Sequence, residues 1–99
     1  MFIILLTYTC TNNKIDEYLV DHRSYLDRYY SQNKFICSGA QQPRNGGVIL
    51  CNGVSKEEVE SIILEDPFNI HALATYQIIE FTPSKFAPAF ESFIQEVKS

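Results

Sequence analysis

The chain has 99 residues and a mass of 11.4 kDa, which is enough for one hydrophobic core and too little for two. Hydrophobic residues make up 45% of the sequence and charged residues 20%, a balance that excludes an intrinsically disordered chain. Eight basic residues against twelve acidic ones give a net charge of -4, so the chain lacks the basic surface that nucleic-acid binding requires. We therefore expect a single domain over residues 1–99, without a nucleic-acid partner.

Cysteine usage and hydropathy predict a soluble, cytoplasmic protein. Cys10, Cys37 and Cys51 are odd in number and widely spaced, whereas a small secreted domain is expected to carry an even disulfide framework. The apolar residues 1–6 lack the positive flank and the cleavage site of a signal peptide. No stretch approaches the roughly 20 apolar residues that a membrane span needs, so we expect no membrane partner.

The first part of the chain predicts a strand followed by a long helix. Residues 2–8 form an apolar, β-branched run without helical spacing, which is typical of a strand. A helix is expected over about residues 14–32, with Asn12 or Asn13 as its N-cap. Its apolar stripe recurs at helical intervals and consists of Ile15, Tyr18, Leu19, His22, Tyr25, Leu26 and Tyr29.

A hairpin and a second helix are predicted next. Strands are expected over residues 35–41 and 47–52, joined by a turn over residues 43–46, where Asn-Gly tolerates the positive φ of a tight hairpin. Ser55 and Glu58 form a capping box, which indicates the start of the second helix.

The last part of the chain predicts a fourth strand and a helical tail. Pro67 disfavours a helical conformation at Asp66, so the second helix ends there or just before. The fourth strand is expected over residues 73–81, and Pro88 fits the first turn of a last helix. That helix has an apolar side formed by Phe86, Phe90, Phe93, Ile94 and Val97.

The predicted order of elements is βαββαβ with a C-terminal helical tail. This order is that of the ferredoxin-like α+β fold, in which right-handed crossovers place both helices on one face of an antiparallel sheet. We assign the core to about residues 1–81 and a helical extension to residues 82–99.

Two of the strands are apolar on both faces, which predicts that both faces of the sheet are covered. In the third strand, Val48 and Leu50 lie opposite Ile49 and Cys51, and residues 2–8 show the same pattern. Two helices cover only one face. The tail helix could cover part of the other, but a second subunit is the more economical cover, so we expect a homodimer with its sheets packed face to face.

Two polar residues occupy positions that are predicted to face the sheet. His22 lies on the stripe of the first helix, and Asp66 continues the apolar face of Val59, Ile62 and Ile63 in the second. A carboxylate is rarely buried unless it is paired, and an imidazole is a natural partner. Such a pair would orient the ring and leave its other nitrogen as a general acid or base. The same spacing also fits a hydrogen-bonded core histidine and an exposed aspartate at a helix end.

Three short segments match a known family in order and spacing. They are Asp21-His22-Arg23-Ser24-Tyr25-Leu26 in the first helix, Ser38-Gly39 in the second strand, and Asp66-Pro67-Phe68. Across about residues 1–81 the chain resembles the YCII-related (YciI-like) family of small dimeric ferredoxin-like proteins. The resemblance implies a dimeric α+β barrel whose pocket holds a His-Asp pair, here His22 and Asp66, with Ser38 and Gly39 on the pocket wall.

The resemblance completes the expected site. We expect His22 and Asp66 to be catalytic, and we expect the substrate to be bound by Ser38, Gly39, Phe68 and Tyr25. The chain departs from the family in two places, since Ala40 follows Ser-Gly where proline is usual and Ala72 stands where glycine is common before the fourth strand.

Other candidates are weaker. His71 could reach the pocket mouth or be a surface residue, and Arg44 could meet an anionic ligand or be an ordinary turn residue. With two histidines and no CxxC or HxxxH spacing we expect no metal site, and without a phosphate-binding glycine motif we expect no nucleotide cofactor.

The expected function is that of a small-molecule enzyme that uses the His-Asp pair as general acid and base. The resemblance implies a lyase-type reaction, because the activities attributed to the family include removal of a halide from a chlorinated aromatic. Two alternatives remain open at this point: a non-catalytic binding or accessory module that holds its ligand in the same pocket, and a purely structural oligomeric domain.

Overall fold

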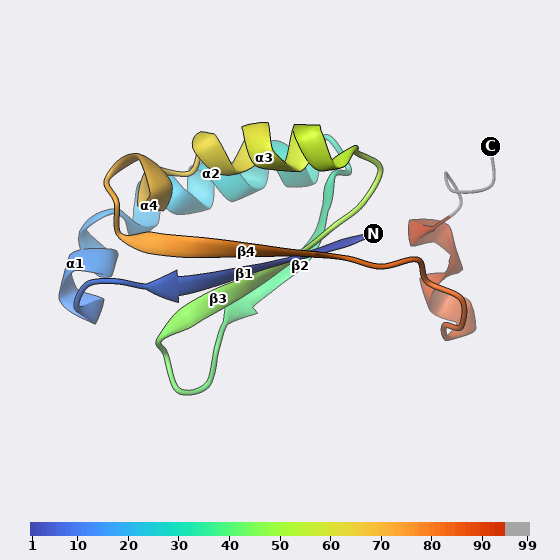
Figure 1. Cartoon of the computed structure of the whole chain (residues 1–99), viewed down its shortest axis with the longest axis horizontal. Helices are drawn as coiled ribbons and strands as arrows, with labels where there is room; N and C mark the ends of the chain where they lie inside the picture. Colours follow the sequence, from blue (N-terminus) through green and yellow to red (C-terminus); the bar gives the residue numbers. More distant parts are fainter. Residues whose placement is uncertain (95–99) are drawn as a thin grey trace.

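A four-stranded antiparallel sheet is the centre of the computed structural model, which describes residues 1–94 (Figure 1). Its strands run in the order β2-β3-β1-β4, with bounds β1 (Phe2–Tyr8), β2 (Phe35–Ala40), β3 (Gly46–Cys51) and β4 (Ala74–Glu80). The other elements are the helices α1 (Asn12–Glu17), α2 (Leu19–Ser31), α3 (Lys56–Leu64) and α4 (Pro67–Ile70) and the 3-10 helix η1 (Pro88–Phe93). This strand order confirms the predicted ferredoxin-like α+β fold.

The two faces of the sheet have different environments. Helices α2 and α3 lie along one face in Figure 1, and there the β1 side chains of Phe2, Ile4 and Leu6 are buried. Within residues 1–94 no helix lies on the opposite face, where Val48 and Ile79 keep 36% and 37% of their surface exposed. None of the helices in this described part is long and apolar enough to cross a bilayer.

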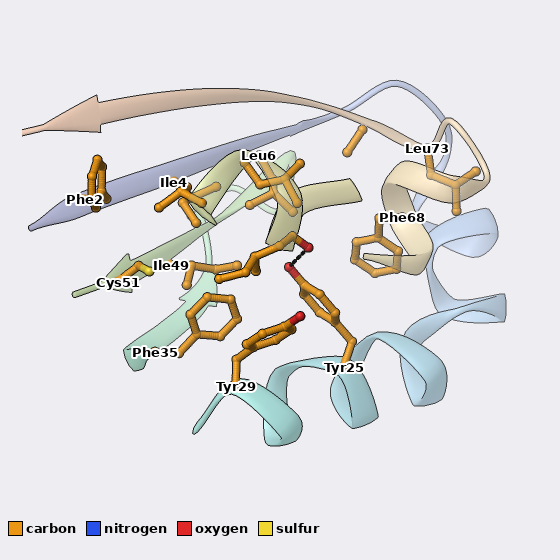
Figure 2. Packing of buried hydrophobic residues seen from close by; sticks show 14 of the residues in the cluster. Phe2, Ile4, Leu6, Tyr25, Tyr29, Phe35, Ile49, Cys51, Phe68 and Leu73 are labelled. Atoms are coloured by element: carbon orange, nitrogen blue, oxygen red, sulfur yellow. Dashed lines mark hydrogen bonds between the residues drawn. The ribbon is translucent and has the colours of Figure 1, made fainter. Parts of the chain in front are cut away.

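The core lies between the sheet and the α2–α3 layer (Figure 2). Tyr25 and Tyr29 point from α2 toward the sheet, and Tyr29 packs against Phe35 with ring centroids 5.3 Å apart. The Tyr25 hydroxyl donates to the carbonyl of Ile62 in α3 at 2.9 Å, which ties the two long helices together. Each buried large apolar side chain contributes about 1.5–3 kcal/mol, so this layer holds the helices in place.

The long first helix is two helices in the structure. Tyr18 leaves the helical region with φ -112° and ψ 9°, so α1 ends at Glu17 and α2 begins at Leu19. The Tyr18 ring stacks on His71 with centroids 4.1 Å apart, and this contact favours the break. Because His71 is far away in the sequence, no local pattern predicts it. The predicted cap was also wrong, because the Thr11 side chain accepts from the amide of Lys14.

A short helix that the sequence did not predict, α4, connects α3 to β4. Asp66 caps its start, and a Schellman motif ends it, with Leu73 N–H donating to Phe68 C=O and Ala72 N–H to Asn69 C=O. Ala72 occupies the left-handed position of that motif with φ 57°. Glycine is the residue usually preferred at such a position, because it has no Cβ to clash with the backbone.

The β2–β3 hairpin also differs from the prediction. Positive φ angles occur at Asn33, Ala72 and Gly53 among the described residues, so neither residue of the Asn45-Gly46 pair has one. The connection instead contains a cis peptide between Gln42 and Pro43. Glycine is needed at position 46 for a different reason: a Cβ there would lie 1.9 Å from the carbonyl oxygen of Leu6.

The C-terminal tail forms a 3-10 helix where an α-helix was expected. Its described part lies beyond the end of the sheet in Figure 1, so it does not cover the open face. Asn52 donates to the carbonyl of Phe93, and Ile94 is buried, whereas Phe86 and Phe93 remain partly exposed. Val97, the last residue of the predicted apolar side, lies outside the described residues.

The left-handed conformation of Ala72 leads to a stability prediction. We expect Ala72→Gly to raise the free energy of unfolding by about 0.5–1 kcal/mol, because relief of the side-chain clash exceeds the added entropy of the unfolded chain. Urea unfolding would measure the change. The matched control is Ala40→Gly in β2, where the same substitution should destabilise the protein. A lower stability for Ala72→Gly would contradict the assignment.

Candidate active site

His22 and Asp66 meet between the helical layer and the sheet. His22 projects from α2, and its Nδ1 atom lies 2.8 Å from Oδ1 of Asp66, at the junction of α3 and α4. The imidazole is 9% exposed and the carboxylate 0%. His22 reaches this position because it shares the inward stripe of α2 with Tyr25 and Tyr29.

Asp66 points inward because it caps α4. Its Oδ1 atom accepts from the backbone amide of Phe68 at 3.0 Å, and Oδ2 accepts from the Tyr76 hydroxyl at 2.7 Å. Helix α3 ends at Leu64, but the Asp66 amide still donates to the carbonyl of Ile63, so Asp66 also continues the inward face of that helix. A buried carboxylate needs several donors to offset its lost hydration, and these three groups supply them.

The hydrogen bond between His22 and Asp66 bears on which ring nitrogen of His22 carries the proton. An ionised carboxylate only accepts hydrogen bonds, so the contact with Asp66 favours the neutral imidazole tautomer that has its proton on Nδ1 and its lone pair on Nε2. The ring is also stacked on Phe68, with centroids 4.0 Å apart and planes at 7°. Hydrogen bond and stacking together hold the imidazole in one orientation.

A cavity of about 280 Å³ lies beside His22. Four of the residues expected at the site line it: His22, Ser38, Gly39 and Phe68. Asp66 lies behind the imidazole rather than on the wall. The remaining lining residues are Leu6, Tyr8, Leu19, Arg23, Leu26, Ala40, Arg44, Gly47, Val48 and Ile49.

The Ser38-Gly39 pair, in β2, forms part of the cavity wall. The Ser38 hydroxyl is hydrogen-bonded to the hydroxyl of Tyr30, which fixes its direction. Nothing lies within 4 Å of a Cβ built on Gly39, and its φ is ordinary. The backbone conformation therefore does not require glycine at position 39. The absence of a side chain there leaves space in the cavity.

Tyr25 is not brought to the cavity. Its hydroxyl donates a hydrogen bond to the carbonyl of Ile62 in the core, and only 4% of the residue is exposed. Burial, together with the nearby negative charge of Asp66, raises the pKa of Tyr25 far above its usual value. The structure therefore supports a packing role for this residue rather than contact with a substrate.

Tyr76 is a site residue that the sequence analysis missed. It lies in β4, where alternation with Ala74 and Ile78 directs it to the helix-covered face, and this alternation was the available signal. Burial and the adjacent charge of Asp66 both raise the pKa of Tyr76. Its hydroxyl therefore stays protonated and donates a hydrogen bond to the carboxylate.

The remaining candidates divide between the cavity and the surface. Arg44 lines the cavity while its Nη2 donates to Asp16 at 2.6 Å, and Arg23, next to His22 in the chain, also lines it. His71 is stacked on Tyr18 and is not among the lining residues. Residues 1–94 contain no group of three or more His, Cys, Asp or Glu side chains that could hold a metal ion.

Fold and site together define a ferredoxin-like α+β domain with a buried His-Asp pair beside a cavity. The YCII-related domain matches residues 1–82, and the chain belongs to that family. Among curated proteins no relative matches significantly.

A solved structure with the same fold is that of 5-chloro-2-hydroxyhydroquinone dehydrochlorinase (TftG) from Burkholderia phenoliruptrix AC1100, in complex with 2,5-dihydroxybenzoquinone. The match has a TM-score of 0.66 at 18% identity and covers 83% of this chain and 94% of that one. At this identity the likeness establishes a shared fold.

The geometry at Asp66 predicts the tautomer of His22. We expect neutral His22 to carry its proton on Nδ1, the opposite of the Nε2-protonated form, because Asp66 accepts at Nδ1. Side-chain ¹⁵N chemical shifts measured above pH 7.5 would identify the protonated nitrogen. Exposed His71 serves as the control within the same molecule. An Nε2-protonated His22 would contradict the hydrogen bond.

Proposed function

We propose that the protein is a small-molecule enzyme that catalyses a lyase-type elimination, with His22 as the general acid and base. The observation that carries this proposal is the 2.8 Å contact of His22 Nδ1 with a wholly buried carboxylate, beside a cavity that His22 lines. A lone pair on Nε2, held in one orientation, is the arrangement that proton abstraction requires.

The residues around His22 have separate roles in the proposed reaction. Nε2 accepts a proton from the substrate, the electron pair of the broken bond to hydrogen forms a new π bond in the substrate, and the halide leaves with the carbon–halogen electron pair. Asp66 stabilises the imidazolium that forms, and Tyr76 and the Phe68 amide hold the carboxylate in position. The dehydrochlorinase that shares this fold supports elimination of a halide as the reaction class.

Chloride release from 5-chloro-2-hydroxyhydroquinone tests the proposal. We expect turnover by the wild type, with kcat about 10²–10⁴-fold lower in His22→Ala and in Asp66→Asn, because each removes proton transfer or its support. The control is His71→Ala, which removes the other histidine away from the cavity and should leave turnover unchanged. Full activity in His22→Ala would overturn the assignment. Recovery of an unchanged ligand whose binding depends on His22 would favour a binding module instead.

We also propose that the enzyme is a homodimer assembled through the open face of its sheet. This face carries half-buried or exposed apolar side chains, namely Ile3, Leu5, Val48, Leu50 and Ile79. Such a contiguous apolar surface is typical of an interface.

Light scattering at micromolar concentration should give twice the chain mass of 11.4 kDa for the wild type. Leu5→Lys should give the single-chain mass with an unchanged circular dichroism spectrum, because a charge at the centre of the open face opposes packing of the sheets. Val20→Lys, at a position that is 74% exposed on α2, is the matched control and should remain dimeric. A monomeric wild type would overturn the proposal.

A further inference from the structure

The charge of the cavity is opposite to that of the protein. The chain as a whole has a net charge of -4, but the described residues that line the cavity include two arginines and a histidine and neither aspartate nor glutamate. Asp66, the nearest acid to His22, lies behind the imidazole ring. A ligand in this space therefore meets only positive or neutral side chains.

The two arginines have hydrogen-bonding capacity left for a ligand. Arg44 donates from Nη2 to Asp16, whose side chain is half exposed and does not line the cavity. A guanidinium has five N–H donors, so its two side-chain partners, Asp16 and Tyr8, leave part of the Arg44 capacity for a ligand. Arg23 forms no ion pair with any residue of the 1–94 segment, although a surface arginine in an acidic protein has many potential partners.

Apart from the hydroxyl groups of Tyr8 and Ser38, the rest of the wall is apolar and partly aromatic. Leu6, Leu19, Leu26 and Ile49 contribute aliphatic surface, and Phe68 contributes the ring on which His22 is stacked. An engineered apolar cavity of about 150 Å³ already binds benzene, so a space of about 280 Å³ accommodates one ring with polar substituents.

The geometry points to a monocyclic aromatic anion, a carboxylate or an ionised phenol, as the ligand of this cavity, with Arg23 and Arg44 binding the negative group. The ring would then lie against the apolar wall within reach of His22. This inference rests on the proposed function, because it specifies the substrate class of the same site. Arginine recognises carboxylate and phenolate oxygens by charge-assisted hydrogen bonds, which are stronger than neutral ones.

Binding of benzoate and of benzamide, its uncharged counterpart, tests the inference without any turnover. In ¹H–¹⁵N NMR titrations of the full chain, benzoate should shift the amides of His22 and Gly39 saturably and bind at least about tenfold more tightly than benzamide. The double variant Arg23→Gln/Arg44→Gln should lose about tenfold or more in benzoate affinity and leave benzamide unchanged.

The control variant is Arg28→Gln, which removes one arginine charge from α2 at a position paired with Glu65 and away from the cavity. It should bind benzoate as the wild type does. The inference is overturned if benzamide binds as tightly as benzoate, if the double variant keeps wild-type affinity, or if benzoate gives no saturable shift. Arginine-dependent benzoate binding without chloride release would instead leave the inference standing and refute the proposed reaction.

Discussion

The structure depends on one carboxylate that is wholly removed from water. Burying the charge of Asp66 costs several kcal/mol unless donors replace its hydration. The three donors come from different elements: His22 from α2, the Phe68 amide from α4 and the Tyr76 hydroxyl from β4. One side chain therefore joins the helical layer, the short connecting helix and the edge of the sheet. Loss of the carboxylate would leave three buried donors without their acceptor, a larger penalty than loss of any single donor.

Much of the fold follows from patterns that are local in the sequence. The strand runs, the capping box at Ser55 and the helical stripe that contains His22 gave the βαββαβ order, because each depends on neighbours a few residues apart. The break at Tyr18 and the helix α4 depend instead on contacts across the fold. Tyr18 is stacked on His71, which lies 53 residues later in the sequence, and no proline or glycine marks the break.

The candidate site was also predictable from the sequence only in part. The stripe of α2 predicted the inward direction of His22, and the need of a buried carboxylate for a partner predicted the 2.8 Å contact with Asp66. The apolar face of α3 predicted the inward direction of Asp66, and the cap that Asp66 forms on α4 is a second cause that the sequence analysis did not include. Tyr76 was missed because strand alternation gives the face that it points to but not the contact with Asp66 that it makes there. Arg23 was missed because its position in the sequence is that of an ordinary exposed residue.

The two parts of the cavity wall differ in how strongly a substitution there would disturb the fold. One wall carries His22 and Phe68, whose positions are tied to the buried carboxylate and hence to the whole core. The other combines residues of strands β2 and β3 with Arg44 from the surface loop between them, which re-enters the sheet at Gly46, where close approach to Leu6 fixes the backbone. Loops on such anchors accept insertions and exchanges at little cost to the domain. Substitutions in the loop that carries Arg44 would therefore change the charge and shape of the cavity while they leave the contact of His22 with Asp66 in place.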